Sequence, residues 1–189
     1  MNPLLSKLCN IALMLLNEAR RLARSNDDGE LILLEHQDRS LWNQDYIREG
    51  LAALDRAFSK PDFGSYTLQA AIAALHSEAS SVATTDWTQI VYLYDRLLQL
   101  TESPVVALNR AVAVSMRDGP QAGIDLIETL FATNVLTQYY LAHAAHADFS
   151  VKLGLTSQAR ASYQKALGLV QQEPERRFLE ARLASLDPQ

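Results

Sequence analysis

The chain has 189 residues, 48% of them hydrophobic, and a formal net charge of −5 at pH 7. This length fits one domain or a short repeat array with a sizeable core. The negative charge argues against nonspecific binding to nucleic acid or to an anionic membrane surface, because both need clustered Lys and Arg. Glycine and proline are few, and Ala and Leu outnumber the β-branched residues, which favours helix over sheet.

The first expected helix covers residues 3–25, where apolar residues recur at helical spacing, and the Asn-Asp-Asp-Gly turn at 26–29 ends it. Within it, Cys9 is the only cysteine, so no internal disulfide forms, and its apolar neighbours predict a small core residue. The apolar run at 11–16 is too short to cross a bilayer and precedes several arginines. No secretory signal pattern is present, and we expect a cytoplasmic protein.

The apolar stretch at 30–35 fits either a strand or a helical turn, and because no partner strand follows, we expect it to be helical or irregular. The next helix, about 44–58, has Asn43 or Ser40 as its expected N-cap. Beyond it the chain is predicted to form helical hairpins, since each apolar stretch begins at a capping residue and stops at Gly or Pro. The expected helices cover about 65–80, 86–100, 104–118, 120–131, 137–154, 156–171 and 174–186. Thr85 or Asp86 is the expected N-cap of the second of these.

An internal repeat is visible in the spacing of small residues. Ala74, Ala111 and Ala147 occupy comparable places on the first helix of three successive pairs, and they lie 37 and 36 residues apart. The tetratricopeptide unit has about 34 residues in two helices. A small residue is expected there because the paired helices approach closely.

The last repeat matches the tetratricopeptide pattern best. Its turn glycine, small contact residues and aromatic residue are Gly154, Ala159, Tyr163 and Ala166. The middle repeat fits only with a shift of about one residue, and a generic antiparallel bundle is the alternative. We therefore predict an all-α fold with an N-terminal helical module over 1–63. Over 64–189 we expect a tetratricopeptide-like superhelix of three helix pairs and a C-terminal capping helix.

Four segments occur in a characteristic order: DGELILLEHQDRSLW at 28–42, GSYTLQAAIAA at 64–74, TDW at 85–87 and SPVVALNRAVAV at 103–114. Together they resemble the C-terminal, tetratricopeptide-like extension of extracytoplasmic-function (ECF) RNA polymerase sigma factors. The resemblance covers essentially the whole chain. It departs from the family pattern at His36, Leu41 and Asn43, where an acidic, a basic and an acidic residue are expected.

The resemblance implies a bacterial regulatory region that modulates transcription initiation. In that family, two helical domains precede this region, bind core polymerase and read the promoter. Nothing in this chain matches them, because no basic recognition helix is present. The implied partners are proteins, namely the attached sigma domains, RNA polymerase or another regulator, with no direct DNA binding by this region and no membrane contact.

The densest polar and aromatic cluster is Glu35–Trp42, and it has three interpretations. In a ligand site, Arg39 would clamp an anion and Trp42 would stack on the ligand. In an enzyme, Glu35 and Asp38 would act as acid and base beside Arg39. In a structural corner, Asp38 or Glu35 would pair with Arg39 while Trp42 is buried between helices. We favour the third interpretation.

Other catalytic and cofactor signatures are absent from the sequence. Neither a Ser-His-Asp signature nor a Gly-rich phosphate loop is present. The four histidines show no metal-ligand spacing: His36, His76, His143 and His146. We expect no catalytic residue, no cofactor and no metal, and therefore no enzyme.

The concave face of a tetratricopeptide array is lined by first helices and binds partners. Candidate residues there are Gln69, Asn109, Arg110 and His143. Asn109 and Arg110 would donate hydrogen bonds to a peptide backbone or a carboxylate, although Asn109 is also placed to cap or bridge adjacent helices. Two further functions compete with the regulatory one: a free-standing peptide-binding scaffold, and a helical enzyme centred on Glu35, Asp38 and Arg39.

Overall fold

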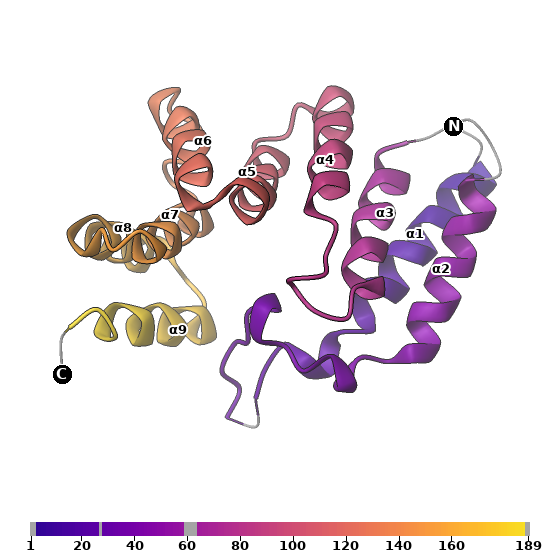
Figure 1. Ribbon diagram of the computed structural model, residues 1–189, viewed down its shortest axis with the longest axis horizontal. Coiled ribbons are helices and arrows are strands. Elements are labelled where there is room, and N and C mark those ends of the chain that lie inside the picture. Colours follow the sequence, from indigo (N-terminus) through magenta and orange to yellow (C-terminus); the bar gives the residue numbers. More distant parts are fainter. Residues whose placement is uncertain (1–2, 27, 59–63, 188–189) are drawn as a thin grey trace. The chain divides into compact units, whose positions relative to one another are not determined.

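The computed structural model describes residues 3–26, 28–58 and 64–187, and these ranges form nine α-helices and three short 3-10 turns (Figure 1). The α-helices are α1 (Pro3–Glu18), α2 (Gln44–Phe58), α3 (Ser65–Glu78), α4 (Trp87–Thr101), α5 (Pro104–Asp118), α6 (Pro120–Ala132), α7 (Tyr140–Lys152), α8 (Thr156–Leu169) and α9 (Glu173–Ala184). The 3-10 turns are η1 (Arg21–Ala23), η2 (Leu34–His36) and η3 (Arg39–Leu41). Across these ranges the only β pairing is an isolated bridge between Ser25 and Leu31. The predicted all-α fold without a sheet is confirmed.

The chain divides into two compact units, Met1–Glu102 and Ser103–Gln189. The boundary predicted after residue 63 falls inside the first unit. The reason is that α3, expected to open the repeat array, packs against α1 and α2 as well as against α4. Residues 59–63, expected to close α2, lie outside the described residues.

In the first unit, α3 is the central helix, and α1, α2 and α3 lie side by side (Figure 1). Small residues permit this close packing. A Cβ atom at Gly50 of α2 would lie 2.8 Å from Leu16 Cγ of α1. Cys9 is fully buried, and its Sγ atom lies 3.0 Å from Thr67 Oγ1 of α3, which confirms it as a core residue.

In the second unit, the helices pack in chain order, α5 on α6, α6 on α7, α7 on α8 and α8 on α9. This arrangement is a helical hairpin array. Ala111 and Ala147 have no exposed surface and Ala74 is buried in the first unit, so the predicted contact positions are confirmed as buried. The signature residues Ala159, Tyr163 and Ala166 are likewise buried.

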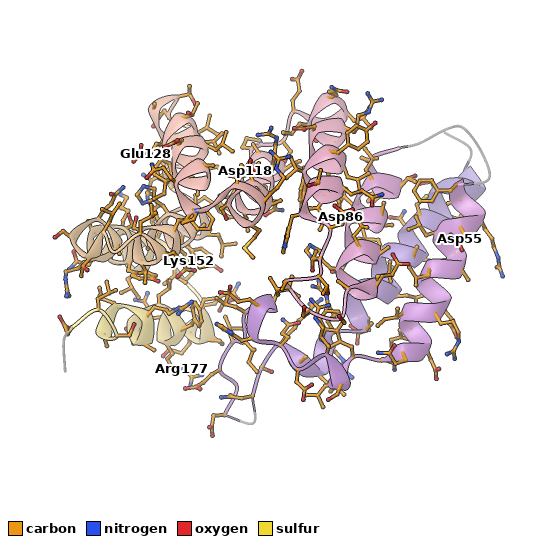
Figure 2. The ribbon with its side chains drawn as sticks, in the orientation of Figure 1. Asp55, Asp86, Asp118, Glu128, Lys152 and Arg177 are labelled. Carbon is orange, nitrogen blue, oxygen red and sulfur yellow. The ribbon has the colours of Figure 1, made fainter. Side chains whose placement is uncertain are left out.

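Two predicted caps are confirmed by side-chain hydrogen bonds. Asn43 Oδ1 accepts from Tyr46 N at 3.0 Å, and Asp86 Oδ1 accepts from Gln89 N at 2.9 Å. Figure 2 labels Asp86 at the start of α4. These bonds satisfy backbone donors that have no partner inside the helix.

Two helix ends differ from the sequence-based expectation. The first helix ends at Glu18, not at residue 25. Beyond it, Ala19 O accepts a hydrogen bond from Asn43 N at 2.9 Å, where a continued helix would have Ala23 N as the donor. The fifth hairpin helix begins at Tyr140, not at residue 137. This helix begins later than expected because Asn134 and Leu136 have φ values of 58° and 60°, which are incompatible with a right-handed helix.

None of the described helices has the length and apolar character needed to cross a bilayer.

Gly123 should be required for the packing of α6 in the second unit. A Cβ atom there would lie 2.6 Å from Ser115 Cβ and 2.7 Å from Phe149 Cε2. We expect Gly123→Ala to lower the free energy of unfolding by about 1–3 kcal/mol through overpacking. The matched control is Gly168→Ala in α8, where no atom lies within 4 Å, and we expect it to be neutral or slightly stabilising. Urea unfolding measures both, and equal stability of the two variants would contradict the packing argument.

Candidate functional site

The segment between α1 and α2 turns so that a guanidinium group meets the end of α3. Asp38 Oδ1 accepts from Ser40 N at 2.9 Å and from Ser40 Oγ at 2.7 Å, which shapes η3. This turn directs Arg39 toward α3, where its Nη1 donates to His76 O at 2.6 Å and to Ala79 O at 2.7 Å. Carbonyls in the last turn of a helix lack intrahelical partners, and a positive charge is favourable at that end.

Trp42 is 3% exposed, and its ring packs against two arginine side chains. The Cζ atom of Arg39 lies 4.4 Å from the centre of the Trp42 ring, and that of Arg20 lies 5.7 Å from it. The expected burial of Trp42 is therefore present. Arg39, however, is anchored by the carbonyls of α3, while Asp38, one of its two expected partners, bonds to Ser40 instead.

The second tryptophan of the protein belongs to the same region. The His76 ring packs edge-on against the Trp87 ring, with centroids 5.3 Å apart, and Trp87 Nε1 donates to Val82 O at 3.1 Å. We refer to Arg20, Arg39, Trp42, His76 and Trp87 together as the arginine–tryptophan corner. It lies entirely in the first unit.

The corner carries an excess of positive charge. Burial, followed by the charges of Arg24 and Arg39, lowers the pKa of Arg20 to about 10. Burial, followed by Arg20 and Arg39, lowers the pKa of His76 from 6.5 to about 4. His76 is therefore neutral at pH 7, because it is poorly hydrated and its neighbours are cationic.

Asp38 differs from the buried carboxyl groups that usually serve in acid–base catalysis. Asp38 is exposed, and its hydrogen bonds from Ser40 lower the pKa of its carboxyl group. The pKa of a catalytic carboxyl group is instead usually raised toward about 7 by burial. Glu35 lies on the neighbouring turn η2, with its Oε1 atom 3.8 Å from His36 Nε2. This geometry gives the enzyme interpretation no support.

The four residues predicted for a concave binding face fall into different units. Gln69 lies on α3 in the first unit, whereas Asn109, Arg110 and His143 belong to the second. Asn109 is exposed and Arg110 is partly exposed on α5.

His143 is engaged by its own unit. Its Nε2 atom lies 3.0 Å from Thr137 O, and its ring stacks on Phe131 with centroids 4.6 Å apart. Burial is the main cause that lowers the pKa of His143. Of the four predicted residues only Asn109 is exposed, whereas Gln69, Arg110 and His143 are partly buried.

A polar network that sequence reasoning missed joins α6, α7 and α8. His146 Nδ1 lies 2.8 Å from Ser162 Oγ, and its Nε2 lies 3.2 Å from Gln158 Nε2 and 3.5 Å from Glu128 Oε1. Figure 2 labels Glu128 on α6. The members come from three helices with no shared motif, so spacing gave no signal.

The Ser162, His146 and Glu128 set has the residue types of a nucleophilic triad but not its surroundings. Ser162 lies inside α8, where neighbouring backbone N–H groups are bonded within the helix. Those groups are the usual source of an oxyanion hole. The network therefore fits a role in joining helices better than acyl transfer.

Residues 8–58 match a family described as a family of unknown function (DUF6596). This range covers most of α1, the connecting segment with Arg39 and Trp42, and α2. Over 175 residues, or 93% of the chain, the sequence is 41% identical to an uncharacterized protein of Rhizobium meliloti (strain 1021). The chain spans 41% of the length of that relative, so most of the relative lies outside the matched region. No solved structure matches the chain.

Arg39→Ala should destabilise the first unit. It strands the carbonyls of His76 and Ala79 and removes the cation from the Trp42 ring, so we expect a loss of about 1–3 kcal/mol in the free energy of unfolding. The control is Arg48→Ala, which removes an exposed ion pair with Asp45 and should cost less than about 1 kcal/mol. Similar melting of the two variants would show that Arg39 is not structural.

His76 should make the first unit sensitive to acid. Its pKa is about 4 in the folded protein and 6.5 as the reference for the unfolded chain, so acidification favours protonation of the unfolded chain. Stability contributed by the neutral ring is complete above pH 6.5 and declines between pH 6.5 and about 4, by up to about 3 kcal/mol. His76→Gln should flatten the pH dependence of unfolding in that window, whereas the exposed His36→Gln should not. Parallel pH profiles for wild type and His76→Gln would refute the assignment.

Proposed function

We propose that this chain is the C-terminal regulatory region of an ECF-type RNA polymerase sigma factor, and that it acts through protein contacts and not as an enzyme. The observation that supports this proposal is the resemblance of four segments to that region, namely residues 28–42, 64–74, 85–87 and 103–114. The structure is compatible with it, since segment 28–42 supplies the corner that anchors the N-terminal helices to α3. The length of the relative beyond the matched region leaves room for additional domains.

The proposed partners are the attached sigma domains, RNA polymerase or another regulator in the bacterial cytoplasm. A net charge of −5 disfavours direct DNA binding and leaves protein recognition as the better use of a helical array. The proposed contact surface includes the exposed Asn109 on α5. Tethering would raise the local concentration of attached domains without requiring a tight intrinsic affinity.

The test is a transcription assay with core polymerase and the complete protein that carries this chain, compared with a version from which residues 1–189 are removed. We expect removal to change transcript yield several-fold at constant protein concentration, and Asn109→Ala to reproduce part of that change. Gln164→Ala, an exposed position on α8, is the control and should behave like wild type.

Two outcomes would reject the proposal. One is a complete reading frame without polymerase-binding domains, which would favour the free-standing scaffold. The other is a transcript yield that is unchanged when the region is removed.

A further inference from the structure

We propose that the arginine–tryptophan corner binds a small anionic group, a carboxylate or a phosphate, through the guanidinium groups of Arg20 and Arg39 and the indole N–H of Trp42. This site is independent of the regulatory function proposed above.

The first observation is a set of polar atoms that are covered and unpaired. Arg39 Nη2, Trp42 Nε1 and His76 Nδ1 are buried and have no hydrogen-bond partner among the described residues. Arg39 and Trp42 can only donate hydrogen bonds. A buried donor without an acceptor is costly, so an acceptor that reaches these atoms gains binding energy.

The second observation concerns charge and decides between an anion and a water molecule. Three guanidinium groups, those of Arg20, Arg24 and Arg39, gather at the C-terminal ends of α1 and α3. Each helix end offers roughly half a negative charge, so about two positive charges remain uncompensated by the helices. Among the described residues, Arg24 and Arg39 lower the pKa of Arg20 while Tyr94 alone opposes them, and Arg20 and Arg39 lower the pKa of His76. A bound anion would reduce the repulsion among the guanidinium groups, whereas a water molecule would only accept hydrogen bonds from them.

The geometry also indicates the kind of anion. Guanidinium groups present planar, forked donors that match the oxygens of carboxylate and phosphate. The side chains of Arg20 and Arg39 are partly exposed, so solvent reaches the rim of the corner. The donors on Arg39 and Trp42 are themselves covered, so an anion reaches them only when the partly exposed side chains of Arg20 and Arg39 shift, and such a movement admits only a small group.

Both tryptophans of the protein lie in the corner, so their indole N–H signals in a nitrogen–proton NMR spectrum report on it directly. The probes are inorganic phosphate and acetate, added at constant ionic strength with sodium chloride as the reference salt. We expect a saturable shift of the Trp42 signal with one or both probes. A smaller shift is expected for Trp87, whose N–H already donates to Val82 O. The variant Trp87→Phe assigns the two signals.

Arg20→Gln should weaken binding at least about ten-fold, because it removes a charge-assisted donor. The matched control is Arg21→Gln, one residue along the chain, whose guanidinium is 70% exposed and pairs with Glu18. It should bind like wild type. Circular dichroism establishes that both variants are folded.

The wild-type titration is decisive even if Arg20→Gln fails to fold. A Trp42 signal that does not move, moves linearly, or moves equally with chloride overturns the proposal as simple salt screening. Unchanged affinity in a folded Arg20→Gln variant also overturns it. Saturation by acetate alone assigns a carboxylate ligand, and saturation by phosphate alone assigns a phosphoryl ligand.

Discussion

The guanidinium of Arg39 on the last carbonyls of α3 is the interaction on which the first unit depends. It ties a long connection, which has little regular structure of its own, to the central helix of that unit. Three interactions stabilise the Arg39 guanidinium there: two charge-assisted hydrogen bonds, the dipole of α3 and a cation–π contact with the Trp42 ring. Burial opposes the charged form of Arg39 and lowers its pKa, and burial together with the charges of Arg20 and Arg39 lowers the pKa of His76.

The second unit depends mainly on close helix packing, and it has a similar contact of its own at the end of α8, where Arg176 Nη2 donates to Val170 O at 2.9 Å. Residues without side-chain bulk lie where helices approach: Ala111, Gly123, Ala142, Ala147, Ala159 and Ala166 are buried. Around them, larger side chains such as Ile127 and Tyr163 fill the space between helix pairs. Polar links, including the His146 network, then join neighbouring helices.

The two proposals concern different units of the chain. The first unit contains the electrostatically unusual corner, and the second presents the exposed residues of α5. An anion bound at the corner, as proposed above, would stabilise the folded first unit, since a ligand that binds only the folded form shifts the equilibrium toward it. The corner belongs to the first unit and α5 to the second, and each proposal is open to testing without the other.

The sequence by itself determined the helical fold, the positions of most helices, the Asn43 and Asp86 caps, and the burial of Cys9, Ala111 and Ala147. These features are set by local hydrogen bonding and by the periodicity of apolar residues, and both can be recognised in a short stretch of sequence. Only the tertiary structure decided the partners of Arg39, which lie 37 and 40 residues away, the division at Glu102, and the meeting of Glu128, His146 and Ser162. A side chain's long-range partner depends on how helices pack in three dimensions, and a single sequence carries no local signal for that.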